Sequence, residues 1–400
     1  MGPMDGVRVV ELGVWVAGPA AGGILADWGA DVVKIEPPGI GDPARLFAQM
    51  LGGDLPFNPP FEMDNRSKRS VVIDLTREAG RGLGLELIAG ADVFVTNVRP
   101  AALARLGFDP ESLRACNPRL VYGLITGYGT EGPEKDKAAY DIAGFWARSG
   151  IAHMLTSPGQ HPPFQRGGMG DHNTGLALAG AISAALFRRE KTGEGQLVTT
   201  SLLREGVYTL SFDLSISARF GVDLAVAERA EMKNPVINNY QDRDGRWFWI
   251  VGLEADRHWP PMCRAIGRVD WIDDPRYATG EARTENAREL ITAIDEIFAT
   301  RPLAEWKPIF DSEQDFWWAP VQTPQELLND PQAKAAGCFC EIPDGETTTL
   351  LPATPADFAG TPCVPRWMAP DAGQHTQEIL TELGRDSAQI TALREAGVIF

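Results

Sequence analysis

Residues 7–36 read VRVVELGVWVAGPAAGGILADWGADVVKIE, and this stretch decides the fold. It opens with a short β-branched run, Val7–Leu12, passes through a glycine-containing turn at Gly13–Pro19, and continues through small residues to Trp28. A second strand-like run follows at Asp31–Glu36. The pattern predicts a strand, a loop, a helix and a second strand in succession, which is the repeating unit of parallel α/β sheets.

The same alternation continues through the first half of the chain. Further strand-like runs lie at Ser70–Leu75, Val93–Asn97 and Leu120–Thr126, and helical stretches such as Arg77–Ala89 separate them. Gln196–Leu203 has the character of a strand that runs into another helix. The predicted fold class is therefore α/β with a parallel sheet.

Two domains are expected from a chain of this length and from a change in its texture. The aromatic-rich run Arg246–Val251 (RWFWIV) differs from everything before it. We expect a large domain over residues 1–205 and 345–400, a smaller α/β domain over 222–325, and linkers at 206–221 and 326–344. Helical stretches near Thr376–Leu383 and Ser387–Ala396 are expected to return to the large domain, because chain termini often lie close together.

Bulk properties restrict the possible partners. The formal net charge of −17 disfavours nucleic acid, which is bound through clustered Lys and Arg. No window approaches the roughly 18 apolar residues that span a bilayer, and no export signal opens the chain, so no membrane partner and a cytoplasmic location are expected. Five cysteines without a CxxC pair, or a histidine at ligand spacing, predict reduced thiols and no metal site. They are Cys116, Cys263, Cys338, Cys340 and Cys363.

The first strand, turn and helix offer one competing interpretation, a dinucleotide-binding unit with Glu36 as the ribose ligand. The glycines of the turn and helix lie at Gly13, Gly18, Gly22 and Gly23. This spacing does not match G-x-G-x-x-G, which brings the backbone close to a pyrophosphate. A nicotinamide cofactor is therefore disfavoured.

Asp171 is the residue with the strongest chemical signal. It follows three glycines, Gly167, Gly168 and Gly170, and precedes a long helical stretch to Glu190. One interpretation is an N-cap, a role that Asp fills well. The other is a nucleophile that the helix dipole keeps ionised, with nearby backbone N–H groups stabilising an oxyanion.

Segments spread over the chain favour the second interpretation. In order they are LGVWVAGP (12–19), GADVVKIE (29–36), NRSKRSVVIDL (65–75), ADVFVTNV (91–98), LGF (106–108), NPRLV (117–121), GDHNTG (170–175), KTGEGQ (191–196), PV (320–321), GQHT (373–376) and ELG (382–384). Together they resemble the class III CoA-transferases, a family that includes formyl-CoA transferase and α-methylacyl-CoA racemase. The resemblance covers nearly the whole chain.

The resemblance carries several implications. Asp171 is implied to be catalytic, the large domain to be Rossmann-like, and the protein to be a homodimer of two chains threaded as interlocked rings. A coenzyme A thioester is implied as substrate, with no permanently bound cofactor. The implied CoA contacts are Val14, Trp15, Val16, Ala17, Ile73, Leu75, Asn97, Val98 and Arg105, and the basic pair Lys68 and Arg69 is chemically suited to the nucleotide phosphates.

The family contains two chemistries, and one position separates them. The racemase moves an α-proton with a His and Asp pair, whereas Tyr140 stands where that histidine would be. A tyrosine, with a reference pKa of about 10, is a poor base at neutral pH. We therefore expect CoA transfer from an acyl-CoA to a carboxylic acid, through aspartyl anhydride and aspartyl-CoA thioester intermediates; racemisation and non-catalytic acyl-CoA binding remain the alternatives.

The supporting residues are expected close to Asp171. Tyr140 and Asp141 would line the acyl site, and amides at Gly167, Gly168 and Gly170 would stabilise oxyanions. The first loop departs from formyl-CoA transferase, because Val16 replaces its glutamine, and Asn234–Gly245 (NPVINNYQDRDG) replaces its glycine-rich flap. These changes suggest a different, bulkier acyl group, whose identity one sequence does not fix.

Overall fold

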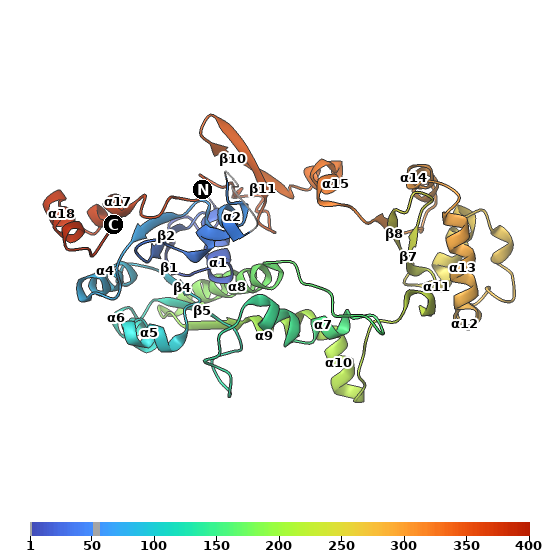
Figure 1. Ribbon diagram of the computed structural model, residues 1–400, viewed down its shortest axis with the longest axis horizontal. Coiled ribbons are helices and arrows are strands. Elements are labelled where there is room, and N and C mark those ends of the chain that lie inside the picture. Colours follow the sequence, from blue (N-terminus) through green and yellow to red (C-terminus); the bar gives the residue numbers. More distant parts are fainter. Residues whose placement is uncertain (1, 51–56) are drawn as a thin grey trace. The chain divides into compact units, whose positions relative to one another are not determined.

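The computed structural model describes residues 2–50 and 57–400 (Figure 1). The chain forms two compact units. The large unit comprises Met1–Met154, Pro163–Leu224 and Lys334–Phe400, and the small unit comprises Leu155–Pro162 and Ala225–Ala333. The predicted linkers do not stand apart: residues 206–221 form helices of the large unit, and 326–344 is divided between the units at residue 334.

A six-stranded sheet organises the large unit. Its strands are β1 (Arg8–Leu12), β2 (Asp31–Glu36), β3 (Arg69–Val72), β4 (Val93–Thr96), β5 (Val121–Thr126) and β6 (Leu197–Ser201). Their order is β3-β2-β1-β4-β5-β6, and every neighbouring pair is parallel. The predicted parallel α/β sheet is confirmed. The order reverses between β1 and β4, and such a switch point is where open α/β sheets bind ligands.

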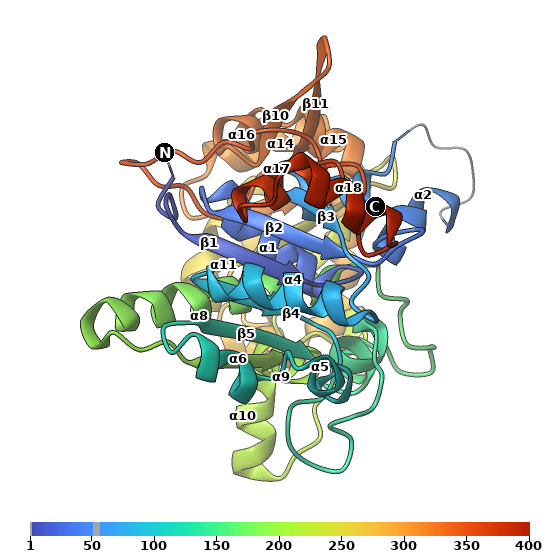
Figure 2. The same ribbon diagram turned by 90° about the vertical axis from the view of Figure 1, so that its left-hand side faces the viewer.

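Helices cover both faces of this sheet (Figure 2). Side chains such as Val9 and Val32 pack against α1 (Ala17–Asp27) and α8 (Met169–Thr192). Val10 and Val33 point to the other face because successive strand residues alternate. That face is covered by α4 (Glu78–Ala89), α5 (Pro100–Leu106), α6 (Pro110–Cys116), α17 (Thr376–Glu382) and α18 (Ser387–Glu395).

The small unit is built on a three-stranded antiparallel sheet, β7 (Ile237–Gln241), β8 (Trp247–Val251) and β9 (Trp318–Pro320). Its helices are α11 (Ala255–Ala265), α12 (Gly280–Glu285), α13 (Ala287–Phe298), α14 (Leu303–Ser312) and α15 (Pro324–Asn329). The rings of Phe248 and Phe298 meet edge to face with centroids 5.0 Å apart, and Phe310 lies 5.6 Å from Phe248. The aromatic texture of this region is therefore its core.

The remaining elements of the described chain are short. They are α2 (Phe47–Met50), α3 (Pro59–Asn65), α7 (Ile151–Met154), α9 (Leu202–Thr209), α10 (Ser211–Phe220), α16 (Pro331–Ala335), a π-helix (Ile142–Ala147) and three 3-10 turns (Pro43–Leu46, Arg229–Glu231, Val269–Trp271). A hairpin of β10 (Phe339–Asp344) and β11 (Thr347–Pro352) was not predicted. The loops after β1, β4 and β5 all leave the same edge of the large sheet, and they carry the site described next.

Candidate active site

The loop after β1 is held along its length by side chains from other elements. Lys34 Nζ donates to the carbonyl of Gly13 at 2.9 Å. Asn97 clamps Val14 from both sides: its Oδ1 accepts the Val14 N–H at 2.9 Å, and its Nδ2 donates to the Val14 carbonyl at 2.8 Å. The Gly13 carbonyl and both backbone groups of Val14 thus have partners outside the loop. The loop therefore enters the site in one fixed conformation.

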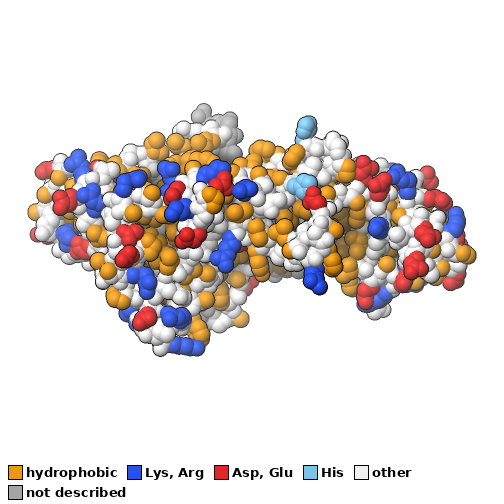
Figure 3. Space-filling view, turned by 90° about the horizontal axis from the view of Figure 1, so that it is seen from below, with side chains coloured by type: hydrophobic (Ala, Val, Ile, Leu, Met, Phe, Trp, Pro, Cys, Tyr) orange, Lys and Arg blue, Asp and Glu red, His pale blue; other side chains and the backbone are white. Residues whose placement is uncertain are grey.

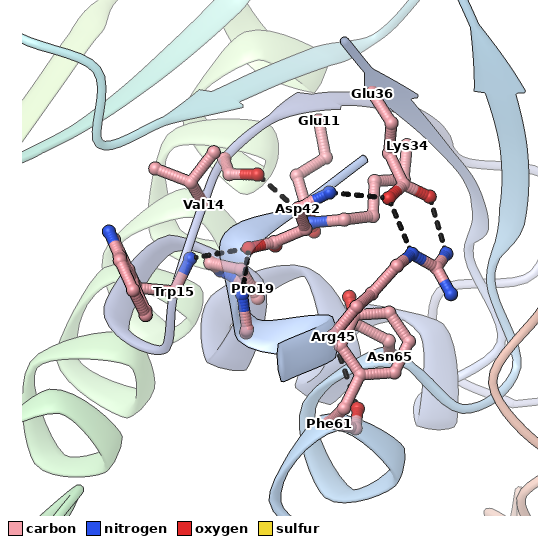
Figure 4. A network of polar contacts seen from close by, with 12 residues as sticks. Glu11, Val14, Trp15, Pro19, Lys34, Glu36, Asp42, Arg45, Phe61 and Asn65 are labelled. Atoms are coloured by element: carbon pink, nitrogen blue, oxygen red, sulfur yellow. Dashed lines mark hydrogen bonds and ion pairs between the residues drawn. The ribbon is translucent and has the colours of Figure 1, made fainter. Parts of the chain in front are cut away.

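Trp15 has a backbone conformation that is rare for a large side chain. Its φ is +66°, in the left-handed region, which costs about 1–2 kcal/mol for a residue with a Cβ. The Trp15 N–H donates to Asp42 Oδ1 at 2.9 Å (Figure 4). Its ring lies 5.7 Å from that of Phe47 and 5.8 Å from that of Tyr140, the latter edge-on at 88°. Such strain persists only where surrounding contacts over-determine it.

A cluster of buried charges underlies this loop (Figure 4). Glu11 accepts hydrogen bonds from Lys34 at 2.8 Å and Lys68 at 2.7 Å, and the side chains of all three are fully buried. Lys34 also pairs with Asp42 at 2.8 Å, so two cations face two carboxylates. Burial opposes ionisation of Glu11, but the charges of Lys34 and Lys68 hold its pKa below its usual value.

The basic pair expected at the nucleotide phosphates is engaged inside the fold. Lys68 is fully buried on Glu11. Arg69 forms ion pairs with Asp31 at 2.7 Å, Glu378 at 2.9 Å and Glu382 at 2.7 Å. Both cations therefore have carboxylate partners, and neither is available to a phosphate in this structure. We withdraw Lys68 and Arg69 as CoA ligands: adjacent basic residues indicated an anion site, but the anions are the protein's own.

Asp171 lies in the first turn of α8, as predicted, but it is not the N-cap. The N-cap is Gly168, whose φ of +81° requires glycine. No residue in the described ranges forms a hydrogen bond with the Asp171 side chain. A Cβ on Gly175 would lie 2.8 Å from that of Ala20, so α8 and α1 approach closely at this point. The carboxylate is thus placed beside the loop after β1 and is not used by the helix.

The amides at the start of α8 serve Asp141 instead of an oxyanion. Asp141 Oδ2 accepts the Gly170 N–H at 3.2 Å and the Gln165 amide at 2.9 Å, and Asp141 is only 7% exposed. Burial raises the pKa of Asp141, and hydrogen bonds from backbone amides that include those of Gly170 and Gly168 oppose this shift. Gly170 is required for space, because a Cβ there would lie 2.3 Å from Phe145 Cγ. We therefore withdraw Gly168 and Gly170 as oxyanion donors, whereas the role of Gly167 stays a prediction.

The electrostatics of Asp171 differ from the sequence-based expectation. Its pKa is raised to about 7, first by burial and then by the negative charges of Asp141 and Asp64, against the opposing charge of His172. A helix dipole contributes about 0.3–1 kcal/mol, whereas one pKa unit corresponds to about 1.4 kcal/mol. The dipole is therefore too weak to keep this carboxylate at its ordinary acidity.

His172 is the nearest basic group to Asp171 along α8. Its Nε2 lies 3.0 Å from Asp64 Oδ1 on α3, and its ring folds back over Gly168, where a Cβ would lie 3.1 Å from His172 Cε1. Partial burial opposes its charging, but the hydrogen bond to Asp64 and the nearby carboxylates raise the pKa of His172. The histidine is thus a paired charge beside Asp171 and not an unengaged base.

A cavity of about 610 Å³ joins these features in the large unit. It brings together eight residues predicted from the sequence: Val14, Trp15, Val16, Ala17, Asn97, Val98, Tyr140 and Asp171. These residues come from the loops after β1 and β4, the segment after β5, and the first turn of α8. Residues distant in the sequence therefore form one wall around a single carboxylate.

Other predicted contacts lie elsewhere. Ile73 is fully buried in the core beneath α4, and Leu75 packs against the same core, so neither side chain reaches the cavity. Ile73 and Leu75 therefore do not line this cavity, and a CoA contact at either residue stays a prediction. Arg105 lies exposed in the last turn of α5, outside the cavity lining, and stays a prediction for a phosphate contact. Asp141 lies behind the lining and acts on Asp171 through its charge.

Three cations of the cavity wall were not predicted from the sequence: Arg99, Lys135 and Lys137. Arg99 directly precedes α5, next to the predicted pair Asn97 and Val98. Lys135 and Lys137 follow β5 and lie next to Tyr140, and Lys137 pairs with Glu134 at 2.8 Å. The available signal was a pair of lysines two residues apart in a loop that leaves the ligand-binding edge of the sheet.

The ranges that the structure describes contain no cluster of three or more His, Cys, Asp or Glu side chains arranged to hold a metal ion. Within the same ranges, no helix is long and apolar enough to cross a membrane. All five cysteines are free thiols. The cavity itself is lined by one carboxylate, that of Asp171, together with cations and aromatic side chains.

The chain is similar to known proteins of one family. A family model described as CoA-transferase family III matches residues 4–376. The chain is 32% identical to (R)-2-hydroxy-4-methylpentanoate CoA-transferase of Clostridioides difficile, covering 99% of both chains, and 34% identical to cinnamoyl-CoA:phenyllactate CoA-transferase of Clostridium sporogenes, covering 98% and 96%. A solved CaiB/BaiF family protein from Brucella suis superposes with a TM-score of 0.82 at 30% identity, over 96% of this chain and 99% of that one.

The first prediction concerns the charge of Asp171, which should titrate near pH 7. The carboxyl is mostly neutral below that pH and mostly anionic above it. Carbon NMR of protein labelled at aspartate Cγ measures the midpoint, and Asp171→Asn identifies the signal. Asp141→Asn should lower the midpoint by about one unit, because it removes a like charge. The exposed Asp5→Asn should leave it unchanged, and a wild-type midpoint near 4 would contradict the account.

Proposed function

The chain belongs to CoA-transferase family III, and we propose that it moves coenzyme A from an acyl-CoA to a carboxylic acid through covalent attachment to Asp171. One observation carries the proposal: Asp171 presents a carboxylate without a hydrogen-bond partner in the described ranges to a cavity of about 610 Å³. The cavity also holds the loop and the cations that a CoA thioester needs. A carboxylate in this position is suited to nucleophilic catalysis.

The reaction runs through four exchanges that leave Asp171 unchanged. Its carboxylate attacks the carbonyl of the donor thioester, and CoA leaves as the thiolate, which produces an aspartyl acyl anhydride. The thiolate attacks the aspartyl carbonyl, releasing the donor acid and leaving an aspartyl-CoA thioester. The acceptor carboxylate then attacks this thioester and displaces the thiolate. Finally the thiolate attacks the acceptor carbonyl, giving the new acyl-CoA and the free carboxylate.

The raised pKa of Asp171 suits this chemistry. A carboxylate with a pKa of about 7 is more basic than an ordinary one, yet about half of it is ionised at neutral pH. Burial strips away the water that would otherwise weaken its nucleophilicity, and it also strengthens electrostatic effects inside the site. The neighbouring anion Asp141 therefore raises reactivity, while His172 keeps enough of Asp171 ionised.

We place coenzyme A along the same cavity. Its thioester would lie beside Asp171 and the loop after β1, and its phosphates near Arg99, Lys135 and Lys137. These residues add local positive charge to a chain whose net charge is −17. Arg105, on the exposed side of α5, would extend this positive surface. Coenzyme A is a substrate in this scheme, and no other cofactor is invoked.

Racemisation finds less support. Tyr140 stands in the position expected for a histidine base, and its side chain is 64% exposed. His172 is engaged with Asp64. The two relatives named above are both CoA-transferases. Their names cover a branched hydroxy acid and aromatic acids, so we leave the donor and acceptor open as an acyl-CoA and a carboxylic acid.

The strand order supports the Rossmann-like character proposed for the large domain, because β3-β2-β1-β4-β5-β6 is the order of doubly wound nucleotide-binding sheets. We propose that this domain, made from both ends of the chain, binds coenzyme A. The cytoplasmic location expected from the sequence stays a prediction.

We also propose an interlocked homodimer, as the family resemblance implies. Helices α9 and α10 expose large apolar side chains: Tyr208 at 75%, Phe212 at 78% and Phe220 at 71%. Figure 3 shows broad areas of hydrophobic side chains on the molecular surface, and such areas mark interaction sites.

Light scattering should give a particle of two chains that persists on dilution, because threaded chains cannot separate without unfolding. A folded, active monomer would contradict this proposal.

The function itself is tested by Asp171→Asn, which keeps the shape of the side chain but removes the nucleophile. Exchange of labelled acid into acyl-CoA should fall by at least about 10³-fold. Calorimetric binding of acyl-CoA should change by less than about threefold, because the side chain acts in chemistry. Asp5→Asn, a surface substitution, should retain full exchange.

The outcomes separate the three hypotheses. If Asp171→Asn exchanges labelled acid into acyl-CoA as fast as the wild-type protein, Asp171 is not the nucleophile. Entry of solvent deuterium at the α-carbon of the acyl group, without exchange of CoA between acids, would indicate racemisation. Tight acyl-CoA binding by the wild-type protein without any turnover would indicate a binding protein.

A further inference from the structure

Asp42 holds the strained residue of the cavity wall without touching the cavity itself. Its Oδ1 accepts the N–H of Trp15 at 2.9 Å and, within its own turn, that of Ala44 at 2.9 Å. Asp42 is fully buried and is absent from the cavity lining, whereas Trp15 belongs to that lining. The left-handed backbone of Trp15 is thus fixed from behind by a carboxylate of a different loop.

The position of Asp42 is itself held by contacts with two residues of β2, Lys34 and Glu36. Lys34 Nζ pairs with Asp42 Oδ2 at 2.8 Å. The backbone N–H of Asp42 donates to Glu36 Oε2 at 2.8 Å. Gly41 precedes it with a φ of +76°, and a Cβ there would lie 2.5 Å from the same Glu36 oxygen. Arg45 binds both carboxylate oxygens of Glu36, through Nε to Oε2 at 2.8 Å and through Nη2 to Oε1 at 2.6 Å (Figure 4). The acceptor for Trp15 therefore has little freedom to move.

The fixed backbone of Trp15 determines where its indole ring lies. Trp15 lies between Phe47 and the exposed Tyr140, with ring centroids 5.7 and 5.8 Å away. With Val14 and Val16 on either side, this gives an apolar, aromatic surface in the same cavity as Asp171. An extended backbone at Trp15 would turn the indole away, because φ decides the direction in which the side chain leaves the chain. The left-handed conformation is what keeps the aromatic wall together.

We propose that Asp42 is a positioning residue for acyl selectivity: by holding the backbone N–H of Trp15, it keeps the indole beside Tyr140 and so favours apolar acyl groups with aromatic or branched side chains over short ones. The proposal deepens the proposed function, because it concerns the acyl group of the same acyl-CoA. Asp42 takes no part in the bond changes. Its effect reaches the substrate only through Trp15.

The test compares two donors that share coenzyme A and differ in the acyl group, 3-phenylpropanoyl-CoA and acetyl-CoA. The ratio of their kcat/KM values is the readout, because general damage to the loop lowers both values together. Asp42→Ala removes the acceptor and should lower the ratio by about tenfold or more. Asp42→Asn retains an Oδ1 acceptor for Trp15 and should keep the ratio within about threefold of wild type, although it loses the charge opposite Lys34.

A double-mutant cycle shows whether Asp42 acts through Trp15. Trp15→Gly removes the indole and has no penalty for a positive φ. In that background, Asp42→Ala should change the ratio by less than about twofold. An equal loss of selectivity in both backgrounds would overturn the proposal, and so would an unchanged ratio in Asp42→Ala alone. If Asp42→Ala does not fold, Asp42→Glu keeps the charge opposite Lys34 but displaces the acceptor, and the same ratio must fall.

Binding measurements test the role of Asp42 even if the protein transfers no CoA. Asp171→Asn supplies a background without turnover, in which calorimetry compares the dissociation constants of the two acyl-CoAs. The preference for the aromatic acyl group should be present there and should be lost on adding Asp42→Ala. If the wild-type protein transfers no CoA but this binding preference follows Asp42, the function fails and the positioning role stands. If transfer is observed but neither ratio depends on Asp42, the positioning role fails alone.

Discussion

The buried pairing of Glu11 with Lys34 and Lys68 is the interaction on which the rest of the site depends. Each ammonium lies against three oxygen atoms: Lys34 against those of Glu11, Gly13 and Asp42, and Lys68 against those of Glu11, Pro19 and Asn65. One acceptor of each is a backbone carbonyl, that of Gly13 for Lys34 and that of Pro19 for Lys68, so the pair fastens both ends of the segment between β1 and α1. Removing one partner of such a buried group leaves an uncompensated charge, which costs about 3–5 kcal/mol. The fold therefore stabilises the cavity wall and the core with the same side chains.

The start of α8 shows how the surroundings set the chemistry of one carboxylate. Asp141 occupies the helix-start amides, and His172 pairs with Asp64 across to α3. Asp171 is left between two anions and one cation in a partly dry setting, and its pKa of about 7 follows from that balance. A carboxylate nucleophile at neutral pH needs to be both ionised and basic. Asp141 and Asp64 raise the pKa of Asp171 and so make it more basic, whereas the charge of His172 lowers the pKa and favours ionisation.

The features that depend on local sequence pattern, or on one conspicuous motif, could be predicted from the sequence. The parallel sheet followed from the alternation that begins at residue 7, and Asp171 followed from its glycine-rich context and from the family resemblance. The partners of charged residues could not be predicted in the same way: Lys68 and Arg69 pair with carboxylates far along the chain, including Glu382. Nor could the raised pKa of Asp171, because it depends on burial and on Asp64 and Asp141, which only the folded chain brings near.

We propose that Asp171 is a covalent carrier, and the most direct measurement of this role is the mass of the peptide that contains Asp171 after a brief incubation with acyl-CoA. Acid quenching should retain an acyl or CoA group on that peptide, and hydroxylamine should convert the activated aspartyl group to a hydroxamate at Asp171. The adduct should appear within the time of one turnover and should be absent from Asp171→Asn. Rapid turnover with unmodified Asp171 at every time point would contradict the central claim.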